Sequence, residues 1–313
     1  YTDSTHLKAN ANKGKYDLAM VAKSRSDYWA DLDAAIDEDR AAHGKASLKP
    51  KERTPAEKET KVSRTDPDSG YMVREGKPKG FFYLDHRTVD GRHAIITDTF
   101  ATPASIHDSV VYLGRLDRQR QRFDFDVQAV GLDAGYATAG IAKGLTDRDI
   151  LGVTGYRNPT PPKSGMMRKS KYVYERQADG YRCPNGQLLT YATTDRNGYR
   201  HYKSDPAICR TCPLLASCTS NANAVRTITR HVWQDEREEV DQRRLTPWGK
   251  AIYKRRKETV ERSFADAKQL FGHRYARFRT LVRVRCQCLL AAAAQNIKKI
   301  ALILTRSPQC LAG

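Results

Sequence analysis

Residues 253–268 have the sequence Tyr-Lys-Arg-Arg-Lys-Glu-Thr-Val-Glu-Arg-Ser-Phe-Ala-Asp-Ala-Lys, which predicts a helix around which the rest of the chain is organised. Thr246 is a suitable N-cap for it, and Pro247 is a suitable first helical residue. Apolar side chains recur at the spacing of one helical face, at Ile252, Val260, Phe264, Ala267 and Phe271. Glu261 lies on a neighbouring stripe together with Lys257 and Lys268. Such a stripe is typical of an ordinary solvated helix face, so a role for Glu261 depends on the rest of the chain.

The composition indicates a partner that carries many negative charges. The chain has 313 residues, and its 55 Lys and Arg exceed its 36 Asp and Glu by 19. Nucleic acid is the leading candidate for such a surplus, and an anionic membrane surface is the alternative. Because the chain begins at Tyr1 and not at Met, we expect a segment upstream of it to be missing.

Membrane-spanning segments are not expected. The sequence has no signal peptide and no run of the roughly 20 apolar residues that a spanning helix needs. Its most apolar stretch, residues 281–304, is interrupted by Arg, Lys, Gln and Asn. That stretch predicts an amphipathic helix packed on a core.

The first half of the chain alternates strand and helix patterns, which predicts an α/β fold. The clearest β pattern is a hairpin with an Asp-Gly turn between Gly80 and Phe100. Pro, Lys and Glu dominate residues 43–68, which predict a mobile or loosely helical insertion at about 40–70. The other predicted elements are a strand in residues 1–12 that starts upstream, helices at 26–40 and about 107–120, a strand at 125–132, a helix to about 146 and a strand at 150–153.

Three carboxylates lie at the edges of predicted elements. Asp3 lies in the first strand, and Asp133 directly follows the strand that ends at Leu132. Ligands and metals tend to bind at the carboxyl ends of such strands, although Asp133 would also serve as an N-cap and Asp3 would also fit a frayed terminus. If both converge with Glu261, they can bind two divalent ions about 4 Å apart, and their hard oxygen ligands favour Mg²⁺ or Mn²⁺. Asp108 is interpreted as a first-turn acid that stabilises the N-terminus of its helix.

The regular pattern breaks between residues 156 and 245. Four cysteines gather there, at Cys183, Cys209, Cys212 and Cys218, and they predict a structural zinc site. Four free thiols in a small hydrophobic cluster are the alternative. The segment is also basic and rich in tyrosine, which suits short strands with a surface that faces nucleic acid; an exposed β-rich insertion without a ligand is the alternative.

The remaining sequence signals concern redox state and DNA. Three further cysteines, Cys286, Cys288 and Cys310, are scattered near the C-terminus. An odd number of cysteines without a secretory signal indicates a reducing compartment. After the opening helix, arginines are interleaved with aromatic rings, a pattern that suits contacts with DNA phosphates. This segment, residues 274–285, holds Arg274, Arg277, Arg279, Arg283 and Arg285, with Tyr275 and Phe278 between them.

Several short motifs occur in a fixed order along nearly the whole chain. They are Tyr1-Thr-Asp-Ser-Thr with Ala9-Asn-Ala-Asn, Leu132-Asp-Ala-Gly-Tyr136, the four-cysteine segment, Thr259-Val-Glu-Arg-Ser-Phe264 with Lys268, and Asn296-Ile-Lys-Lys299. Together they resemble the DDE transposases of bacterial insertion sequences, most closely the IS1182-like group, which is related to IS4 and IS5. The Tyr–Arg–Glu–Lys signature of related groups fits with a displacement of one position, because Tyr253 lies eight residues before Glu261, and Lys257 stands where arginine is common.

The resemblance implies an RNase H-like catalytic core with the catalytic residues Asp3, Asp133 and Glu261, which would bind two Mg²⁺ or Mn²⁺ ions. The core would comprise residues 1–155 and the C-terminal helices 246–313, separated by the cysteine-containing insertion 156–245. The N-terminal DNA-binding domain usual in such families would be missing. The residues predicted to contact DNA are Arg256, Lys257, Lys268, Arg274, Arg277 and Arg279.

The implied activity is metal-dependent cleavage of DNA at transposon ends, followed by strand transfer into target DNA. The partners would be double-stranded DNA and a second copy of the chain in a synaptic homodimer, in the bacterial cytoplasm at the nucleoid. One alternative is an inactive or truncated transposase that only binds DNA. Another is a zinc-stabilised nucleic-acid adaptor that does not depend on Glu261.

Overall fold

The computed structural model has mixed α/β structure and describes residues 1–22, 29–49, 57–73, 76, 78–156, 158–162 and 165–306. Cys310 lies outside the described residues. The chain divides into two compact units. The first comprises Tyr1–Ser26, Arg53–Tyr156 and Glu236–Gly313, and the second comprises Asp27–Glu52 and Arg157–Asp235.

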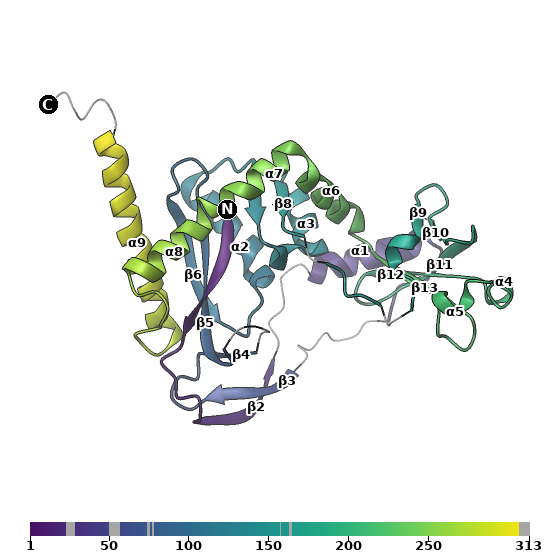
Figure 1. The fold of residues 1–313 in the computed structure, drawn as a ribbon, viewed down its shortest axis with the longest axis horizontal. Helices are drawn as coiled ribbons and strands as arrows, with labels where there is room; N and C mark the ends of the chain where they lie inside the picture. Colours follow the sequence, from purple (N-terminus) through teal and green to yellow (C-terminus); the bar gives the residue numbers. More distant parts are fainter. Residues whose placement is uncertain are drawn as a thin grey trace. The chain divides into compact units, whose positions relative to one another are not determined.

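A mixed six-stranded sheet forms the centre of the first unit (Figure 1). Its strands are β1 (Thr2–Lys8), β4 (Gly70–Met72), β5 (Gly80–Val89), β6 (Ile96–Pro103), β7 (Ala129–Leu132) and β8 (Leu151–Thr154). β1 lies between β5, which runs antiparallel to it, and β7, which runs parallel to it. β8 continues the parallel part, while β4 and β6 pair with the other edge of β5. The predicted strands are confirmed, although the strand predicted at 125–132 begins only at Ala129.

The pairing of β1 with β7 places two acidic residues side by side. Thr2 pairs with Leu132, and the two strands run in the same direction. The next residue on each chain is an aspartate, Asp3 on β1 and Asp133 after β7. Both aspartates therefore lie at the same level of the sheet.

Helices pack against this sheet and close its hydrophobic core. Leu132 of β7 packs with side chains of α2 (Asp108–Phe123) and α3 (Ala139–Thr146), whose predicted positions are confirmed. The buried members of that cluster are Tyr112, Leu116, Val130, Leu132, Tyr136, Ile141, Leu145 and Ile150. β1 and β5 pack on α9 (Leu281–Arg306) through Leu7, Phe81, Tyr83, Val284 and Cys288.

The helix predicted over residues 246–268 begins as expected. α7 (Pro247–Lys254) follows α6 (Gln234–Leu245), and Thr246 is its N-cap. The Thr246 hydroxyl accepts a hydrogen bond from the Gly249 amide at 3.0 Å. Sequence signals for a helix start are local, which explains why this one could be found without the fold.

The same helix is not continuous, which corrects the prediction. A 3₁₀ turn at Arg255–Lys257 follows α7, Thr259 leaves helical geometry with φ −106° and ψ −96°, and α8 (Val260–Leu270) begins afterwards. The Thr259 hydroxyl donates to the Arg255 carbonyl at 2.8 Å, a local bond that competes with the helical ladder. The predicted apolar face persists only within α8. Lys257 and Glu261 consequently do not share one helical stripe.

The polar stretch predicted to be mobile or loosely helical contains a strand. β3 (Glu57–Ser63) pairs antiparallel with β2 (Tyr16–Ala22) over its whole length. The Lys61 ammonium lies 3.9 Å from the centre of the Tyr16 ring. Residues 50–56 of this stretch lie outside the described residues. A two-stranded ribbon solvated on both faces has no apolar alternation, so its sequence resembles a polar linker.

The second unit contains a five-stranded antiparallel sheet in which consecutive strands are neighbours. Its strands are β9 (Val173–Glu175), β10 (Gly180–Arg182), β11 (Leu188–Thr194), β12 (Tyr199–Lys203) and β13 (Thr227–His231), with the short helices α4 (Pro206–Cys209) and α5 (Leu215–Cys218) after β12. Tyr172, Tyr181 and Tyr202 are buried and form its core with Leu189 and Ile228. These three tyrosines are therefore not a stacking surface for nucleic acid, which corrects that interpretation of the tyrosine-rich segment.

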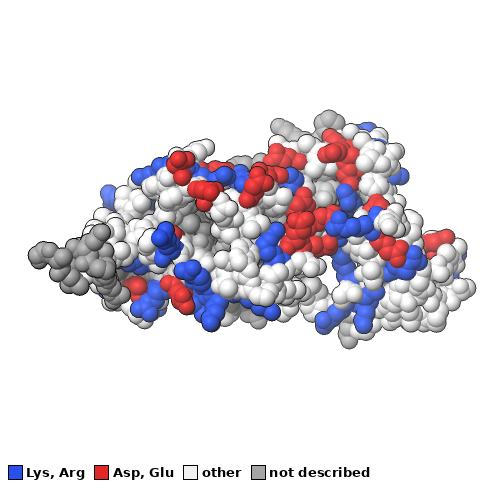
Figure 2. Space-filling model, turned by 90° about the horizontal axis from the view of Figure 1, so that it is seen from above, with Lys and Arg blue, Asp and Glu red and all other residues white. Residues whose placement is uncertain are grey.

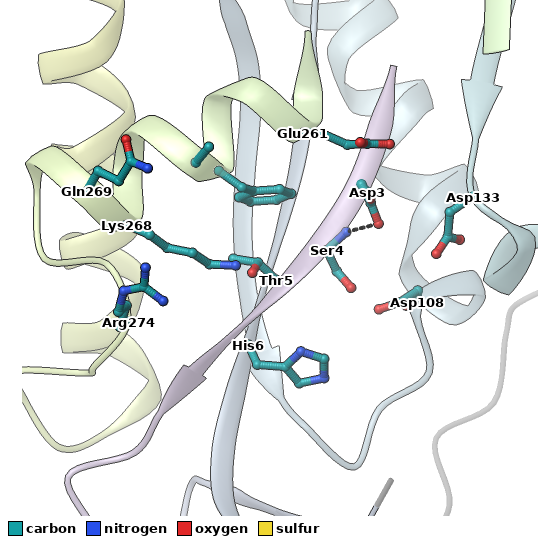
Figure 3. A pocket seen from close by; sticks show the side chains of 12 residues that line it. Asp3, Ser4, Thr5, His6, Asp108, Asp133, Glu261, Lys268, Gln269 and Arg274 are labelled. Carbon is teal, nitrogen blue, oxygen red and sulfur yellow. Dashed lines mark hydrogen bonds between the residues drawn. The ribbon is translucent and has the colours of Figure 1, made fainter. Parts of the chain in front are cut away.

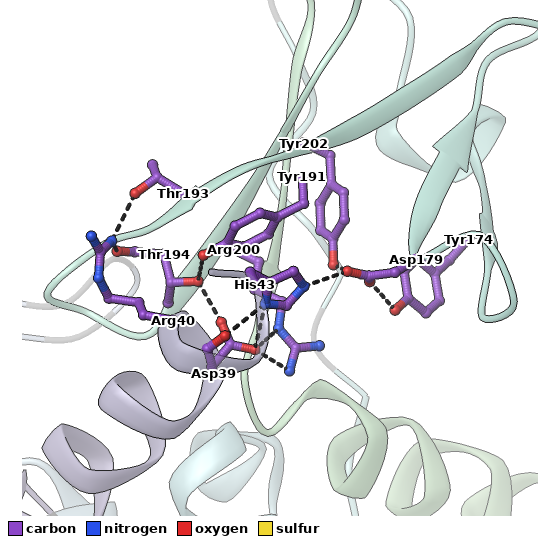
Figure 4. Close-up of polar contacts among 10 residues, drawn as sticks. All are labelled: Asp39, Arg40, His43, Tyr174, Asp179, Tyr191, Thr193, Thr194, Arg200 and Tyr202. Carbon is purple, nitrogen blue, oxygen red and sulfur yellow. Dashed lines mark hydrogen bonds and ion pairs between the residues drawn. The ribbon is translucent and has the colours of Figure 1, made fainter. Parts of the chain in front are cut away.

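α1 (Trp29–Ala42) belongs to this second unit, although residues 1–155 were predicted to form one part of the core. The buried carboxylate of Asp39 accepts hydrogen bonds from Arg200 Nε at 2.6 Å and from the Thr194 hydroxyl at 2.5 Å (Figure 4). His43 stacks on Tyr191 and lies 2.6 Å from the Asp179 carboxylate. Side chains more than 130 residues away in sequence therefore decide where α1 packs.

α9 has an apolar side that the described core does not cover. The side chains of Val284, Cys288 and Ala292 are buried, whereas those of Val282 and Leu290 are exposed. By length and composition alone, Leu281–Thr305 could cross a membrane, contrary to the expectation that no run is long enough. Core helices of soluble proteins pass the same test, and the amphipathic packing predicted for this segment is seen in its first half.

Candidate active site

Four carboxylates surround one cavity of about 580 Å³ in the first unit. They belong to Asp3, Asp133 and Glu261, which the sequence singled out, and to Asp108, which it did not. Figure 3 shows the side chains of Asp3, Asp108 and Asp133 gathered around one space, with Glu261 extending from α8 across β1. The three predicted carboxylates are thus brought together by the fold.

Each of the predicted carboxylates is placed by a different element. Asp3 lies on β1, and its Oδ1 accepts the Ser4 amide at 2.8 Å. Asp133 caps the turn after β7 by accepting the Gly135 amide at 2.8 Å, so the N-cap role considered for it coexists with its position at the cavity. Glu261 lies in the first turn of α8 and its side chain is 45% exposed.

Arg256 lies among these acids and not on the DNA-accessible surface. It is 3% exposed, and its Nη2 donates to Asp3 Oδ2 at 2.6 Å. Its Nη1 lies 3.7 Å from Glu261 and donates to the Tyr253 hydroxyl at 3.3 Å. The break before α8 turns this side chain inward. A buried, paired guanidinium does not fit the DNA contact predicted for Arg256, and we correct that assignment to one of holding Asp3 and Glu261.

Burial and mutual repulsion both raise the pKa values of the aspartates at the cavity. Burial raises the pKa of Asp3 to about 7; Arg256 opposes the rise, and the charges of Asp133 and Asp108 add to it. Burial likewise raises the pKa of Asp133, against the Gly135 amide and Arg256, with Asp108 again adding to the rise. A divalent cation would relieve this repulsion. Carboxylate oxygens are the donors that Mg²⁺ and Mn²⁺ prefer, so the residues present fit such ions.

The predicted DNA-contacting residues fall into two groups. Lys268 and Arg274 line the same cavity as the acids. Lys257, Arg277 and Arg279 are exposed and are not among its lining residues. On the face of the molecule in Figure 2, Lys and Arg are interspersed with Asp and Glu instead of forming one continuous block.

The cysteines predicted to bind zinc line a second, small cavity of about 30 Å³ in the other unit, and each of the four is a free thiol. They are Cys183, Cys209, Cys212 and Cys218. The Cys218 sulfur lies 3.0 Å from the Tyr172 hydroxyl, and the Cys212 sulfur lies 3.5 Å from the Asn185 amide nitrogen. Tetrahedral zinc needs sulfurs about 4 Å apart. In the described part of the chain, the grouping of three ligand atoms within 4.8 Å of one another is instead Asp85, His273 and Cys288.

Sequence reasoning missed Asp108 because a local explanation sufficed for it. An acid in the first turn of a helix is common and needs no partner elsewhere. The available signal was its position, since Asp108 begins the helix that directly follows the hairpin of the central sheet. Only the fold shows that this helix start reaches the cavity beside β1 and β7.

Comparison with known protein families gives a match over part of the chain. Residues 182–301 match the family described as Transposase DDE domain. The matched range includes Glu261 and the cysteine segment but not Asp3 or Asp133. No curated protein and no solved structure matches the chain. The match supports a transposase DDE domain over residues 182–301, a kind of domain that implies DNA transposition, DNA binding and the divalent metal ions that such transposases generally use.

Proposed function

We propose that this chain is a DDE transposase of the IS1182-like group, with an RNase H-like core that cleaves DNA at transposon ends and transfers the freed strand to target DNA. The observation that carries the proposal is the convergence of Asp3, Asp133 and Glu261 on one cavity. A mixed sheet flanked by helices supports the RNase H-like assignment. The family match within 182–301 supports the reaction class.

Each acidic or basic residue has a part in the proposed reaction. Asp3, Asp133 and Glu261 would hold two Mg²⁺ or Mn²⁺ ions, and such ions would supply activation of the attacking oxygen and charge stabilisation of the leaving one. Arg256 keeps the carboxylates of Asp3 and Glu261 in place. Lys268 lies on the cavity wall, where an ammonium can contact the phosphate being cleaved.

The reaction proceeds in two displacements at phosphorus. Water attacks the phosphodiester at the transposon end, and the 3′ oxygen leaves as a free hydroxyl. That hydroxyl then attacks a phosphodiester of the target and displaces its 3′ oxygen. From the resemblance we add that the DNA is double-stranded, that two copies of the chain act together and that they work in the bacterial cytoplasm.

Nicking of end-sequence DNA in the presence of Mg²⁺ tests this proposal. The wild-type chain is expected to nick, and Asp133→Asn to lose nicking while keeping DNA binding. Asp126→Asn is the matched control, because Asp126 is exposed and precedes the same strand. Full nicking by Asp133→Asn would overturn the catalytic assignment, and DNA binding without nicking by the wild type would favour the binding-only remnant.

We also propose that the four cysteines hold a structural zinc ion. All four line one cavity, and a closed structural zinc site takes four ligands of which cysteine thiolates are the commonest. Elemental analysis of the mildly purified protein is expected to give one zinc per chain. Cys212→Ser should lower that value, whereas Cys286→Ser, at an exposed cysteine of α9, should not. Substoichiometric zinc in the wild type would favour the free-thiol alternative.

A further inference from the structure

We propose that Asp108 is a fourth metal-binding carboxylate of the cavity, an assignment that rests on the proposed function. Asp108 is the first residue of α2 and lines the cavity with Asp3, Asp133 and Glu261. In Figure 3 its side chain extends from α2 towards the space shared by Asp3 and Asp133. It would supply a ligand oxygen from the side of the cavity opposite α8.

The ordinary explanation for Asp108, stabilisation of a helix start, does not account for its surroundings. The N-cap of α2 is His107, whose Nδ1 accepts the Ser109 amide at 3.3 Å. A first-turn acid that serves a helix end is normally solvated. Asp108 is instead 6% exposed.

The carboxylate of Asp108 is incompletely satisfied in the described part of the chain. Its Oδ1 is buried and has no hydrogen-bond partner there. The Nδ1 atom of His86 lies 3.5 Å from this oxygen, while the other nitrogen of that ring bonds the Thr102 hydroxyl at 2.8 Å. Burying a carboxylate without a bonded partner is costly. The cost is offset if a cation in the cavity takes a carboxylate oxygen as ligand.

Ligand number supports the same assignment. Mg²⁺ and Mn²⁺ prefer six oxygen ligands, of which carboxylates usually provide only some. Two ions held by three carboxylates must share most of them. Because Arg256 already occupies one oxygen of Asp3, a fourth carboxylate gives the ions a further donor, and the Oδ1 atom of this carboxylate accepts no hydrogen bond from the described residues.

Mn²⁺ binding to the full chain, measured by isothermal titration calorimetry, tests the inference independently of DNA cleavage. Asp108→Asn is expected to weaken Mn²⁺ binding at least about tenfold. The matched control is Asp117→Asn, on the same helix, where Asp117 pairs with Arg148 away from the cavity lining. Asp108→Glu, which keeps a carboxylate, should bind Mn²⁺ more tightly than Asp108→Asn.

Thermal unfolding without metal separates a ligand from a structural acid. A ligand role predicts that Asp108→Asn unfolds no earlier than the wild type in EDTA but gains less stability from Mn²⁺. Wild-type Mn²⁺ affinity in Asp108→Asn, with weakened binding in Asp133→Asn, would overturn the role of Asp108 and leave the proposed function standing. Absence of Mn²⁺ binding by the wild-type chain would overturn both.

Discussion

Asp85 and Asp3 both lie on the central sheet, and each pairs with an arginine, but the surroundings of the two carboxylates differ completely. Asp85, on β5, is fully buried and accepts hydrogen bonds from Arg87 at 2.8 Å, from the Thr99 hydroxyl at 2.5 Å and from His273 at 2.9 Å. Although burial opposes it, the charge and hydrogen bonds of these partners lower the pKa of Asp85 to about 2. This carboxylate is satisfied on all sides by the protein itself.

Asp3 has one cationic partner and two acidic neighbours, and it faces an open cavity. Arg256 bonds one of its oxygens, while burial raises its pKa and the nearby charges of Asp133 and Asp108 add to the rise. Asp85, by contrast, lies close enough to His273 and Cys288 to suggest a metal site. Arg87 already supplies the positive charge there. Proximity of ligand atoms is therefore a weaker indication of a metal than buried carboxylates that repel one another beside a cavity.

The largest expected effect comes from the carboxylates that line the cavity, which we call the open cluster: Asp3, Asp108, Asp133 and Glu261. Glu261→Gln should lower DNA nicking on the order of 10³-fold, about 4 kcal/mol in the barrier, because one of the carboxylates proposed to bind metal is lost. The free energy of unfolding should change by less than about 1 kcal/mol, since the side chain is 45% exposed.

Nicking rates and urea unfolding, measured on the same preparation, check whether Glu261→Gln lowers the activity without lowering the stability. Glu258→Gln, at an exposed position three residues earlier, is the control and should match the wild type in both assays. A large loss of stability in Glu261→Gln would contradict the view that the open cluster serves chemistry more than folding.

The next effect concerns the buried carboxylate of Asp85 and its partners Arg87, Thr99 and His273, which we call the closed network. Arg87→Met leaves the buried carboxylate of Asp85 without its main cation and should lower the free energy of unfolding by about 3 kcal/mol. Urea denaturation measures it, with Arg92→Met, at an exposed position of the same hairpin, as control. An unchanged midpoint would mean that His273 and Thr99 alone satisfy Asp85.

The contributions of Asp85 and Asp3 to the free energy of unfolding should depend on pH in opposite directions. The folded pKa of Asp85 lies below its unfolded value, so its contribution is present above about pH 4 and is lost as the pH falls towards 2, amounting to about 2 kcal/mol. The folded pKa of Asp3 lies above its unfolded value, so its contribution is lost as the pH rises towards 7 in the absence of metal. Urea midpoints between pH 2.5 and 7 in EDTA should therefore pass through a maximum, and Mn²⁺ should remove the decline on the neutral side. A midpoint that rises steadily to pH 7 in EDTA would contradict the raised pKa of Asp3.

Features with local signals could be predicted from the sequence, and features set by distant partners could not. The central strands have strong apolar runs, and Thr246 has the side chain of an N-cap, so both were found. The break before α8 was missed because Arg256 has the same helical pattern whether or not it bonds Asp3, which lies 253 residues away. α1 was placed in the wrong unit for the same reason, since Asp39 finds Thr194 and Arg200 only in the fold.

Three acidic residues of the candidate site could be predicted from the sequence, but the other charged residues that surround them could not. The positions of Asp3, Asp133 and Glu261 at element edges suggested that they meet. Nothing local showed that Asp108 would join them or that Arg256 would face inward. Tyr181 and Tyr202 illustrate the same limit, because tyrosines in short strands suit a stacking surface and a buried core equally well, and here they are buried.

The smallest expected effect lies at Arg256, the arginine that pairs with Asp3 as Arg87 pairs with Asp85. Replacing it allows the open cluster and the closed network to be compared directly. Arg256→Gln removes the cation of Asp3 but leaves that carboxylate beside a cavity that water and ions can enter, so the loss of stability in EDTA should be only about 1–2 kcal/mol. Mn²⁺ should then stabilise the variant more than it stabilises the wild type, because the metal replaces the missing charge and no guanidinium repels it. Melting temperatures with and without Mn²⁺ measure both quantities, and Lys257→Gln, at an exposed position of the same 3₁₀ turn, is the control. A smaller gain from Mn²⁺ in Arg256→Gln would show that Arg256 mainly orients the carboxylates for the metal, and the contrast with Arg87 would then be one of geometry and not of charge.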